Sequence, residues 1–472
     1  MAEMTRGQCE GRGIPRRDGG RWAWCAVAAA LLLAASAYAA ERHVGAGQPY
    51  TSIQSAIDDS APGDTVTVHA GTYTEPQIVI NRSVTVRAAP GEARPHLAGN
   101  VTSHNSAVVS VTAAGAVFSG VEVTNEYVSD FPNAYPAPTT GRATGYLVYV
   151  DATAASVTID DCVLHHGRHG IYAGGDDVTI THCDIHDFTQ EGIWLAGPGA
   201  CTVKANWIHD TSWFDLRPAN ISSGQVFGIL LDSPRASTGT SEVSFNYISG
   251  TRSAITYRAR GDAPASYPAS TLILAHNTID GNLDTVTDLG PPLRGFNARG
   301  EYAYNTIGIS IFRNEVDTVT FNAADIVIRD NLIANCAWYG LYAGEGAHFD
   351  LVGDLPVTRS LFWNNYWNDA YWPGTKYPEE WPGARGEVGW SGYGADFLLA
   401  SSLVADPQFI AASPLDPEIF YSLAFTSPAY KTASDGLNIG AWQDFIIPEP
   451  ATGALLLATA TLLARRRRPG AA

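Results

Sequence analysis

The stretch VTIDDCVL at Val157–Leu164 decides the fold, because its pattern returns along the middle of the chain. The copies share a β-branched pair, two polar residues, then Cys or Asn, and a final polar–apolar step. They read VTITHCDI at Val178–Ile185, TVKANWI at Thr202–Ile208, VSFNYI at Val243–Ile248, LILAHNTI at Leu272–Ile279 and IVIRDNLI at Ile326–Ile333. Alternating β-branched positions without a helical period indicate strands, and self-similarity at this spacing indicates a solenoid.

The Cys or Asn position sets the register of the repeat. It falls at Cys162, Cys183, Asn206, Asn246, Asn277 and Asn331, with first intervals of 21 and 23 residues. About 21 residues suits three short strands and three turns, which is one rung of a parallel β-helix. Val157, Ile159, Cys162 and Leu164 then point inward and Asp160 outward. Stacked Asn side chains would satisfy turn groups that are otherwise buried without a partner.

A second strand follows in each repeat and opens on a small residue. It reads GIYA at Gly170–Ala173, GIWL at Gly192–Leu195, GILL at Gly228–Leu231, AITY at Ala254–Tyr257 and GLYA at Gly340–Ala343. Ahead of the repeats, TSIQSAIDDSA at Thr51–Ala61 places Ile53, Ala56 and Ile57 on one helical stripe, which predicts a short capping helix. Five stretches interrupt the repeat and are predicted to form long side loops: 127–145, 211–225, 260–270, 281–300 and 366–394.

The N-terminal segment resembles that of the pectin-lyase-like superfamily. The likeness rests on TSIQSAIDDSA, on PGDTVTVHAGTY at Pro62–Tyr73, and on DPQF at Asp406–Phe409, SPAY at Ser427–Tyr430 and NIGAW at Asn438–Trp442 as closing rungs. It implies an all-β, right-handed parallel β-helix over residues 40–445. This superfold hosts lyases, hydrolases and inert adhesive proteins, so the resemblance implies a fold and no single chemistry.

Both ends of the chain look like sorting segments. Five Arg precede an apolar run from Trp22 to Ala37 and an Ala-Tyr-Ala site, which predicts a signal peptide over residues 1–39 rather than a membrane anchor. Residues 446–472 carry Pro448, Glu449 and Pro450, an apolar stretch and four Arg. This order resembles the PEP-CTERM signal of Gram-negative bacteria. It implies an exosortase-type protease as partner and an extracellular or cell-surface location after transient anchoring by a C-terminal transmembrane helix.

The charge balance excludes some partners. The chain holds 29 basic and 47 acidic residues; residues 1–40 and 451–472 contain nine and three of these, which leaves 20 and 44 in residues 41–450. So acidic a body repels nucleic acid and anionic membrane, and it disfavours polyanionic polysaccharide. We expect a monomer. Cys162 and Cys183 lie one rung apart, where a disulfide and a stacked pair of thiols are both open.

One ladder of polar residues follows the Cys/Asn turn. His165, His186 and His209 come to lie above one another, with His166, Asp187 and Asp210 beside them. At a rung spacing of about 4.8 Å they can share protons or a metal ion, and nearby carboxylates would raise their pKa. Simple internal duplication explains the same ladder without a function. No metal-ligand spacing such as C-x-x-C is present, so no metal site is assigned.

A second ladder lies on the outward side of the second strand. If the Ile and Leu positions face inward, then Tyr172, Trp194, Leu230, Thr256 and Tyr342 face outward, and Asp232 and Arg258 take matching positions on neighbouring rungs. Aromatic faces stack on sugar rings and charged groups bind their hydroxyls, so this face suits a polysaccharide. The alternative is that loops bury these aromatics as a satellite core.

These residues support two alternative hypotheses for the function of the protein. The first is a protein that binds or processes polysaccharide, as a lyase or glycoside hydrolase if it is catalytic. In it Arg258, with Lys204 or His209, supplies the base, Asp232 and Asp210 act as acid or as ligands of a cation such as Ca²⁺, and Tyr172, Trp194 and Tyr342 hold sugars. Arg258 and Lys204 are expected on different faces, and no Lys–Arg pair of alginate- or chondroitin-type lyases is matched. The second class is a non-catalytic structural or adhesive protein.

Overall fold

The computed structural model of the protein describes most of the body of the chain. The described residues are 39–103, 105–125, 145–197, 199–209, 226–232, 239–259, 271–281, 306–313, 319–322, 325–336, 339–343, 349–352, 355–363, 365, 368–371, 397–398, 401–409 and 423–441. The predicted signal peptide, the Pro448-Glu449-Pro450 motif, Asp210 and most of the predicted side loops lie outside them. Within these ranges no helix has the length and apolar character needed to cross a membrane.

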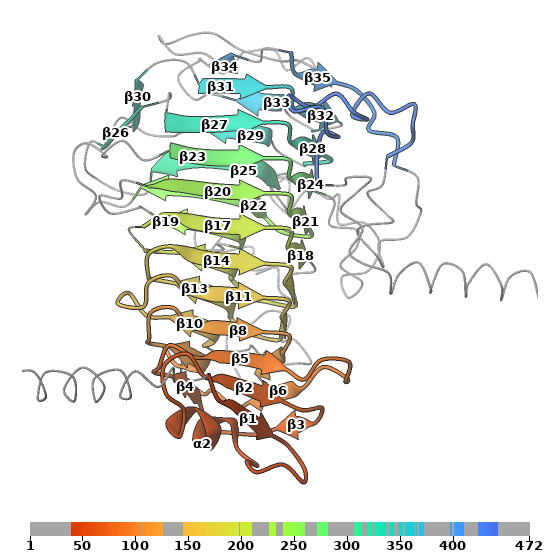
Figure 1. Cartoon of the computed structure of the whole chain (residues 1–472). Helices are drawn as coiled ribbons and strands as arrows, with labels where there is room; N and C mark the ends of the chain where they lie inside the picture. The colour runs from red at the N-terminus through yellow and green to blue at the C-terminus, as the bar shows by residue number, and fades with distance from the viewer. Residues whose placement is uncertain are drawn as a thin grey trace, which may run out of the picture. The chain divides into compact units, whose positions relative to one another are not determined.

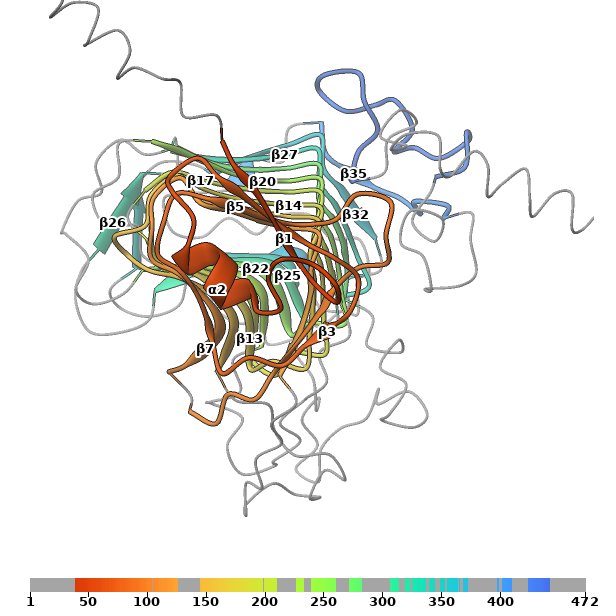
Figure 2. The same ribbon diagram turned by 60° about the horizontal axis from the view of Figure 1, so that its bottom comes forward.

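Three parallel sheets wind around one apolar interior (Figures 1 and 2). Sheet A contains β1 (Glu41–Val44), β2 (Thr65–Val68), β5 (Thr85–Ala88), β8 (Val117–Ser119), β11 (Thr158–Asp160), β14 (Val178–Thr181), β17 (Cys201–Lys204), β20 (Thr240–Ser244), β23 (Thr271–Ala275), β27 (Ile326–Arg329), β31 (Leu355–Thr358) and β34 (Phe397–Leu398). Sheet B contains β3 (Thr72–Tyr73), β6 (His96–Gly99), β9 (Glu122–Asn125), β12 (Val163–His165), β15 (Asp184–His186), β18 (Trp207–His209), β21 (Tyr247–Ser249), β24 (Thr278–Asp280), β28 (Leu332–Ala334), β32 (Leu361–Trp363) and β35 (Leu403–Val404).

Sheet C completes each rung. It contains β4 (Ile78–Ile80), β7 (Ala107–Val111), β10 (Tyr146–Val150), β13 (His169–Ala173), β16 (Glu191–Leu195), β19 (Phe227–Asp232), β22 (Ser253–Ala259), β25 (Ile307–Arg313), β29 (Tyr339–Ala343) and β33 (Asn368–Tyr371). A separate pair of strands, β26 (Val319–Asn322) and β30 (Phe349–Val352), also runs parallel. From β2 to β25 the chain passes from sheet A to B to C and back to A, so within this range each strand pairs with the strand three places away along the chain. This confirms the predicted all-β parallel β-helix.

The predicted facing of the repeat is confirmed in its first copy. Val157, Ile159 and Leu164 are fully buried, Cys162 is 1% exposed, and Asp160 lies on the partly exposed side. The small residue near the start of the sheet C strand has a steric reason. A Cβ atom on Gly192 would lie 2.7 Å from the carbonyl oxygen of Gly228 on the next rung, which is closer than packed atoms approach.

A buried Asn ladder joins the rungs at the turn between sheets A and B. The Asn206 amide donates to Asn246 Oδ1 at 2.9 Å, Asn246 donates to Asn277 at 2.9 Å, and Asn277 donates to Asn331 at 3.0 Å. Each Oδ1 also accepts the backbone N–H of the Asn one rung before it. The residue before each Asn is left-handed, for example Ala205 at φ 56°. The ladder thus satisfies the polar groups of a turn whose backbone L-residues seldom adopt.

The capping helix is confirmed, with shorter bounds than the stretch that predicted it. Helix α2 covers Ile53–Asp58, and the Ser52 hydroxyl at its N-cap accepts the N–H of Ser55 at 3.3 Å. The Glu75 carboxylate accepts the N–H of Ile53 at 2.7 Å, which satisfies another free donor of the first turn. Ile53, Ala56 and Ile57 are buried, so the helix closes the apolar interior at the N-terminal rung (Figure 2).

The C-terminal segment, residues 423–441, does not form the closing rungs that its resemblance predicts. It packs on the side of the solenoid, against the turns between sheets A and B (Figure 1). Asp330 is fully buried there; its carboxylate accepts the Ser434 N–H at 2.6 Å and its carbonyl accepts the Gly440 N–H at 2.8 Å. His276, 1% exposed, contacts Asp435 Oδ2 at 3.0 Å. Turn residues of earlier rungs therefore supply the hydrogen-bond partners of this segment that strand pairing would otherwise supply.

Docking of the C-terminal segment is expected to weaken in acid. Burial alone would raise the pKa of Asp435, but the N–H of Leu437 and the charge of His276 outweigh it and lower that pKa from 3.8. A lowered pKa stabilises the folded state above the ordinary value, and the gain is lost as the pH falls through the lowered value. Buried Asp330 and partly exposed Arg329 face the same imidazole. We expect the amide protection factors of residues 423–441, which relate each exchange rate to that of an unprotected amide at the same pH, to fall severalfold below about pH 4.

The Asp435→Asn variant is the control for this prediction. It should show the lower protection factors already at neutral pH and no further fall in acid. Equal exchange in the variant and the parent protein at neutral pH would show that Asp435 does not hold the segment.

Candidate functional site

The outer face of sheet C carries a row of aromatic side chains on three neighbouring rungs. Strand register places Tyr149, Tyr172 and Trp194 directly above one another, and all three are partly exposed. The Tyr149 and Tyr172 rings stack with centroids 4.9 Å apart and planes 4° apart. Trp194 stands at 84° to Tyr172 with a centroid distance of 5.0 Å, which is an edge-to-face contact and not a stack. We call these three residues the aromatic row.

The aromatic row ends at Trp194. The next two residues in register, Leu230 and Thr256, are fully buried, so the expectation of a continuous exposed ladder is wrong there. The Thr256 hydroxyl is hydrogen-bonded to those of Ser253 and Ser310, both at 2.8 Å. Tyr342 is in the same register but 9% exposed, and it lies four rungs beyond Trp194, about 19 Å along the axis. It is therefore not part of the aromatic row.

An ion pair fixes the orientation of the Trp194 indole. Arg258 Nε and Nη2 donate to the two carboxylate oxygens of Asp232, each at 3.0 Å, and both residues are 4% exposed. The Trp194 Nε1–H donates to Asp232 Oδ2 at 3.1 Å. Asp232 and Arg258 lie opposite each other on β19 and β22, as the sequence predicts. The charged atoms predicted to act as acid and base are thus bonded to each other, and their catalytic roles stay predictions.

The structure does not bring the five predicted catalytic residues together. Lys204 lies on sheet A, exposed, with its ammonium 5.0 Å from the Phe245 ring centroid. His209 lies on sheet B, and Arg258 and Asp232 lie on sheet C. The expectation that Lys204 and Arg258 sit on different faces is confirmed. Because His209 is on a third face, the described members cannot act on one substrate bond, and Asp210 lies outside the described residues.

The pairing of His169 and Glu191 is a feature of this face that sequence analysis missed. The two residues open β13 and β16 in register, with His169 Nδ1 2.5 Å from Glu191 Oε2. His169 is 1% exposed and Glu191 4%. Tyr146 stacks on the His169 ring at 4.6 Å, and Trp194 lies 5.6 Å from it on the other strand. Their signal in the sequence is a polar residue directly before the Gly of GIYA and GIWL, at the start of a strand that is otherwise apolar.

The His ladder forms on sheet B, and one expectation about it is wrong. The His165 and His186 rings stack at 4.7 Å, and the His186 and His209 rings at 5.0 Å. Burial lowers the pKa of His165, and the hydrogen bond that its ring donates to Glu122 does not make up for it, so the predicted rise does not occur there. Among the described residues no group of three or more His, Cys, Asp or Glu could hold a metal ion.

Cysteine chemistry is not part of this face. Cys162 and Cys183 are free, buried thiols. Of the two arrangements that the sequence leaves open, a disulfide and a stacked pair of thiols, the structure therefore has the stacked pair. Burial raises the pKa of Cys183 well above its ordinary value and that of Cys201 to about 11, so neither thiol ionises readily.

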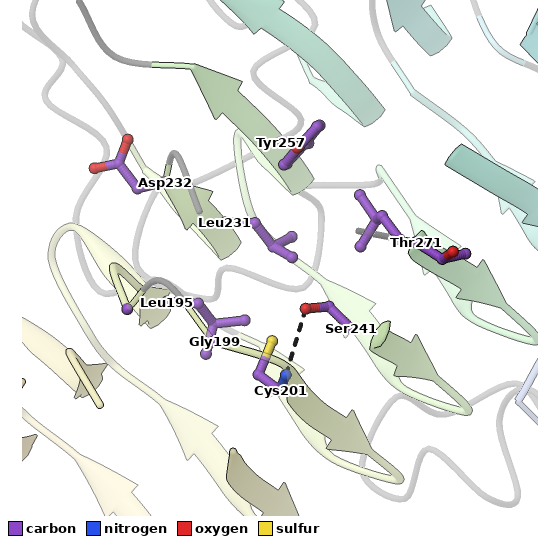
Figure 3. Close-up of a pocket in the computed structure, with 10 residues that line it drawn as sticks. Leu195, Gly199, Cys201, Leu231, Asp232, Ser241, Tyr257 and Thr271 are labelled. Atoms are coloured by element: carbon purple, nitrogen blue, oxygen red, sulfur yellow. Dashed lines mark hydrogen bonds between the residues drawn. The ribbon is translucent and has the colours of Figure 1, made fainter. Parts of the chain in front are cut away.

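A small pocket lies where strands of sheet C lead into sheet A (Figure 3). Leu195, Leu231, Tyr257 and Cys201 are among its lining residues, and the Cys201 N–H donates to the Ser241 hydroxyl at 3.3 Å. Its volume of about 30 Å³ holds one or two waters and no sugar ring. The candidate site is therefore the open face of sheet C.

Comparison with known proteins agrees with this architecture. Residues 145–371 match the family model described as the right handed beta helix region. No curated protein matches the chain. Among solved structures the chain is similar to the Dettilon tailspike protein, at 16% identity and a TM-score of 0.38, covering 75% of this chain and 65% of that one. It is also similar to pectate lyase Pel9A, at 13% identity and a TM-score of 0.41, covering 86% and 96%.

A third similar structure is the alginate lyase from Paenibacillus sp. str. FPU-7, at 13% identity and a TM-score of 0.35, covering 68% of this chain and 92% of that one. Scores and identities this low carry no argument about activity. The matched segment includes the aromatic row, His169, Glu191 and the Asp232–Arg258 pair. The sheet topology and the family match together show that the chain folds as a right-handed parallel β-helix.

Proposed function

We propose that the protein binds a polysaccharide along the outer face of sheet C, with Trp194 as the principal sugar platform. The observation that carries the proposal is the state of Trp194. Its indole is partly exposed, is fixed by a hydrogen bond to a buried carboxylate, and stands perpendicular to Tyr172. A rigid aromatic face loses little side-chain entropy when a sugar ring stacks on it, whereas Tyr149 and Tyr172 already stack on each other.

The charges of this face favour a neutral polysaccharide. Asp232 and Arg258 compensate each other in a bidentate pair. Of the residues 40–450, 44 are acidic and 20 are basic, so a polyanion would be repelled on approach. Sugar hydroxyls instead offer hydrogen bonds to the hydroxyls of Tyr149 and Tyr172 at the edges of their stacked rings.

We further propose that the protein is exported and held at the cell surface. The support comes from the sequence: a basic, apolar segment with a cleavage site over residues 1–39, and the Pro448-Glu449-Pro450 motif before an apolar stretch and four Arg. An exosortase-type protease would act on the second segment. Loss of surface attachment on deletion of residues 446–472, detected by cell fractionation, is the expected result, and unchanged attachment would contradict it.

Replacing Trp194 by alanine is expected to weaken binding of a neutral polysaccharide about tenfold or more, which corresponds to about 1.4 kcal/mol. Affinity electrophoresis or calorimetry against a panel of neutral glycans measures the effect. Trp207→Ala is the matched control, because Trp207 is also partly exposed but lies on sheet B. Equal losses in both variants would show that the glycan binds elsewhere, and no binding of any glycan by the parent protein would favour a purely structural role.

A further inference from the structure

We propose that His169 is a catalytic base on this face and that Glu191 orients it, so that the protein hydrolyses an ester carried by the bound neutral polysaccharide. The inference rests on the proposed function, since it needs a glycan on sheet C. It starts from three polar atoms. Within the described residues, His169 Nδ1, His169 Nε2 and Glu191 Oε2 are buried and make no hydrogen bond of good geometry. Buried polar atoms without a partner are rare, and functional sites are one place where they occur.

The contact between the two residues selects the state of the imidazole. Glu191 Oε2 lies 2.5 Å from His169 Nδ1, close enough for a charge pair although the angle is not that of a hydrogen bond. A carboxylate beside Nδ1 holds the ring proton on that nitrogen. The lone pair of a neutral His169 is then on Nε2, where it is available to accept a proton. An imidazole backed by a carboxylate is the arrangement of a general base.

The surroundings connect this pair to the proposed glycan site. Trp194 lies 5.6 Å from the His169 ring, and the Tyr146 ring covers the imidazole at 4.6 Å and 20°. Tyr146 is the partly exposed member of this stack. Rotation of Tyr146 away from this stack would open the imidazole to a group next to a sugar held on Trp194. Tyr146 is thus a cover and His169 the reacting group.

The pairing of Asp232 with Arg258 argues against glycosidic bond cleavage by two acids. Glu191 is in register with Phe227, and Asp232 follows five residues later on the same strand. The Cα atoms of the two residues are about 16 Å apart along the strands, and the Asp232 carboxylate is held by Arg258 and by the Trp194 N–H, so it does not serve as the second carboxylate of a glycosidase. Elimination from a uronate would place a substrate carboxylate beside Glu191 in a strongly acidic body. Hydrolysis of an ester needs only one base that later returns its proton.

The step balances with water as the only other reactant. His169 Nε2 takes a proton from water while the water oxygen bonds to the acyl carbon and the carbonyl electron pair moves onto its oxygen. When that pair returns, the bond from the acyl carbon to the sugar oxygen breaks, and the proton on Nε2 passes to that oxygen. The products are a carboxylic acid and a sugar hydroxyl. Glu191 stays ionised throughout and stabilises the transient imidazolium.

The test uses the purified full chain with O-acetylated glucomannan as substrate and deacetylated glucomannan as ligand. His169→Gln is expected to lower the rate constant for acetate release about 10²–10⁴-fold with unchanged affinity for the deacetylated polymer. Glu191→Gln should also lower it, and Glu191→Asp should recover part of the loss. Thermal unfolding of each variant checks folding, and ¹⁵N NMR of the His169 ring should show the proton on Nδ1 in the parent protein and not in Glu191→Gln.

Each outcome bears on the proposal. Acetate release by His169→Gln at the parent rate, or glycan binding by the parent protein without acetate release, would overturn the inference and leave the proposed function standing. Unsaturated products from a uronate polymer would overturn the ester assignment. Absence of binding to every glycan would overturn the proposed function itself.

Discussion

Replacing Asn277 by alanine is expected to lower the free energy of unfolding by about 3–5 kcal/mol. The Asn277 amide donates to Asn331 Oδ1 at 3.0 Å and to the Val243 carbonyl at 2.9 Å, and its Oδ1 accepts from the backbone N–H and the side-chain amide of Asn246. All these groups are buried, so truncation leaves several of them without a partner. Urea denaturation followed by circular dichroism measures the change.

Asn105→Ala is the control for the ladder. Asn105 is exposed, so its replacement should change stability by less than about 0.5 kcal/mol. If Asn277→Ala were as stable as Asn105→Ala, the ladder would not be what satisfies the turns. The effect on folding should also be shared with neighbouring rungs, because each rung of a solenoid is stabilised by its contacts with the next.

Replacing Arg258 by methionine is expected to destabilise the protein by about 3–5 kcal/mol, because it leaves the Asp232 carboxylate buried without its cation. It should also weaken glycan binding, since Asp232 would no longer be held where it accepts the Trp194 N–H. Thermal unfolding and glycan affinity measured on one preparation give both effects.

The double variant Arg258→Met with Asp232→Leu separates charge from packing. Removing both charges should restore most of the stability, because replacing a buried pair by apolar groups is often neutral. It should not restore glycan affinity, because the Trp194 N–H still lacks its carboxylate. Lys204→Ala, on the exposed side of sheet A, should change neither property. A stable Arg258→Met single variant would contradict the structural role assigned to the pair.

The sequence predicts the rungs well because the repeat fixes two things at once. The Cys or Asn position sets the register, and alternation then decides which side chains face the interior. Cys162, Asn206 and Asn277 lie where this logic places them, and Asp232 meets Arg258 across neighbouring rungs for the same reason. Local pattern and neighbour stacking are enough in a fold where each unit contacts only the next.

Two features cannot be predicted from the repeat. One is which of the three sheets carries each residue, and the other is how far each side chain is buried. Lys204, His209 and Arg258 are close in rung number but lie on three sheets. Outward register did not predict that Leu230 and Thr256 would be buried. Burial also decides the direction of the His165 pKa. Hydrogen bonds to turn residues such as Asp330 position the C-terminal segment. Its sequence motifs do not reveal that it packs on the side of the solenoid.

Hydroxyl-radical footprinting with and without a bound neutral oligosaccharide tests the glycan face most directly. The method oxidises accessible aromatic side chains, and mass spectrometry reads each one separately. We predict protection of Tyr149, Tyr172 and Trp194 on sheet C, with unchanged oxidation of Trp207 and of Trp363, which is 37% exposed on sheet B. Protection of the sheet B tryptophans, with the aromatic row unaffected, would contradict the assignment of sheet C as the binding face.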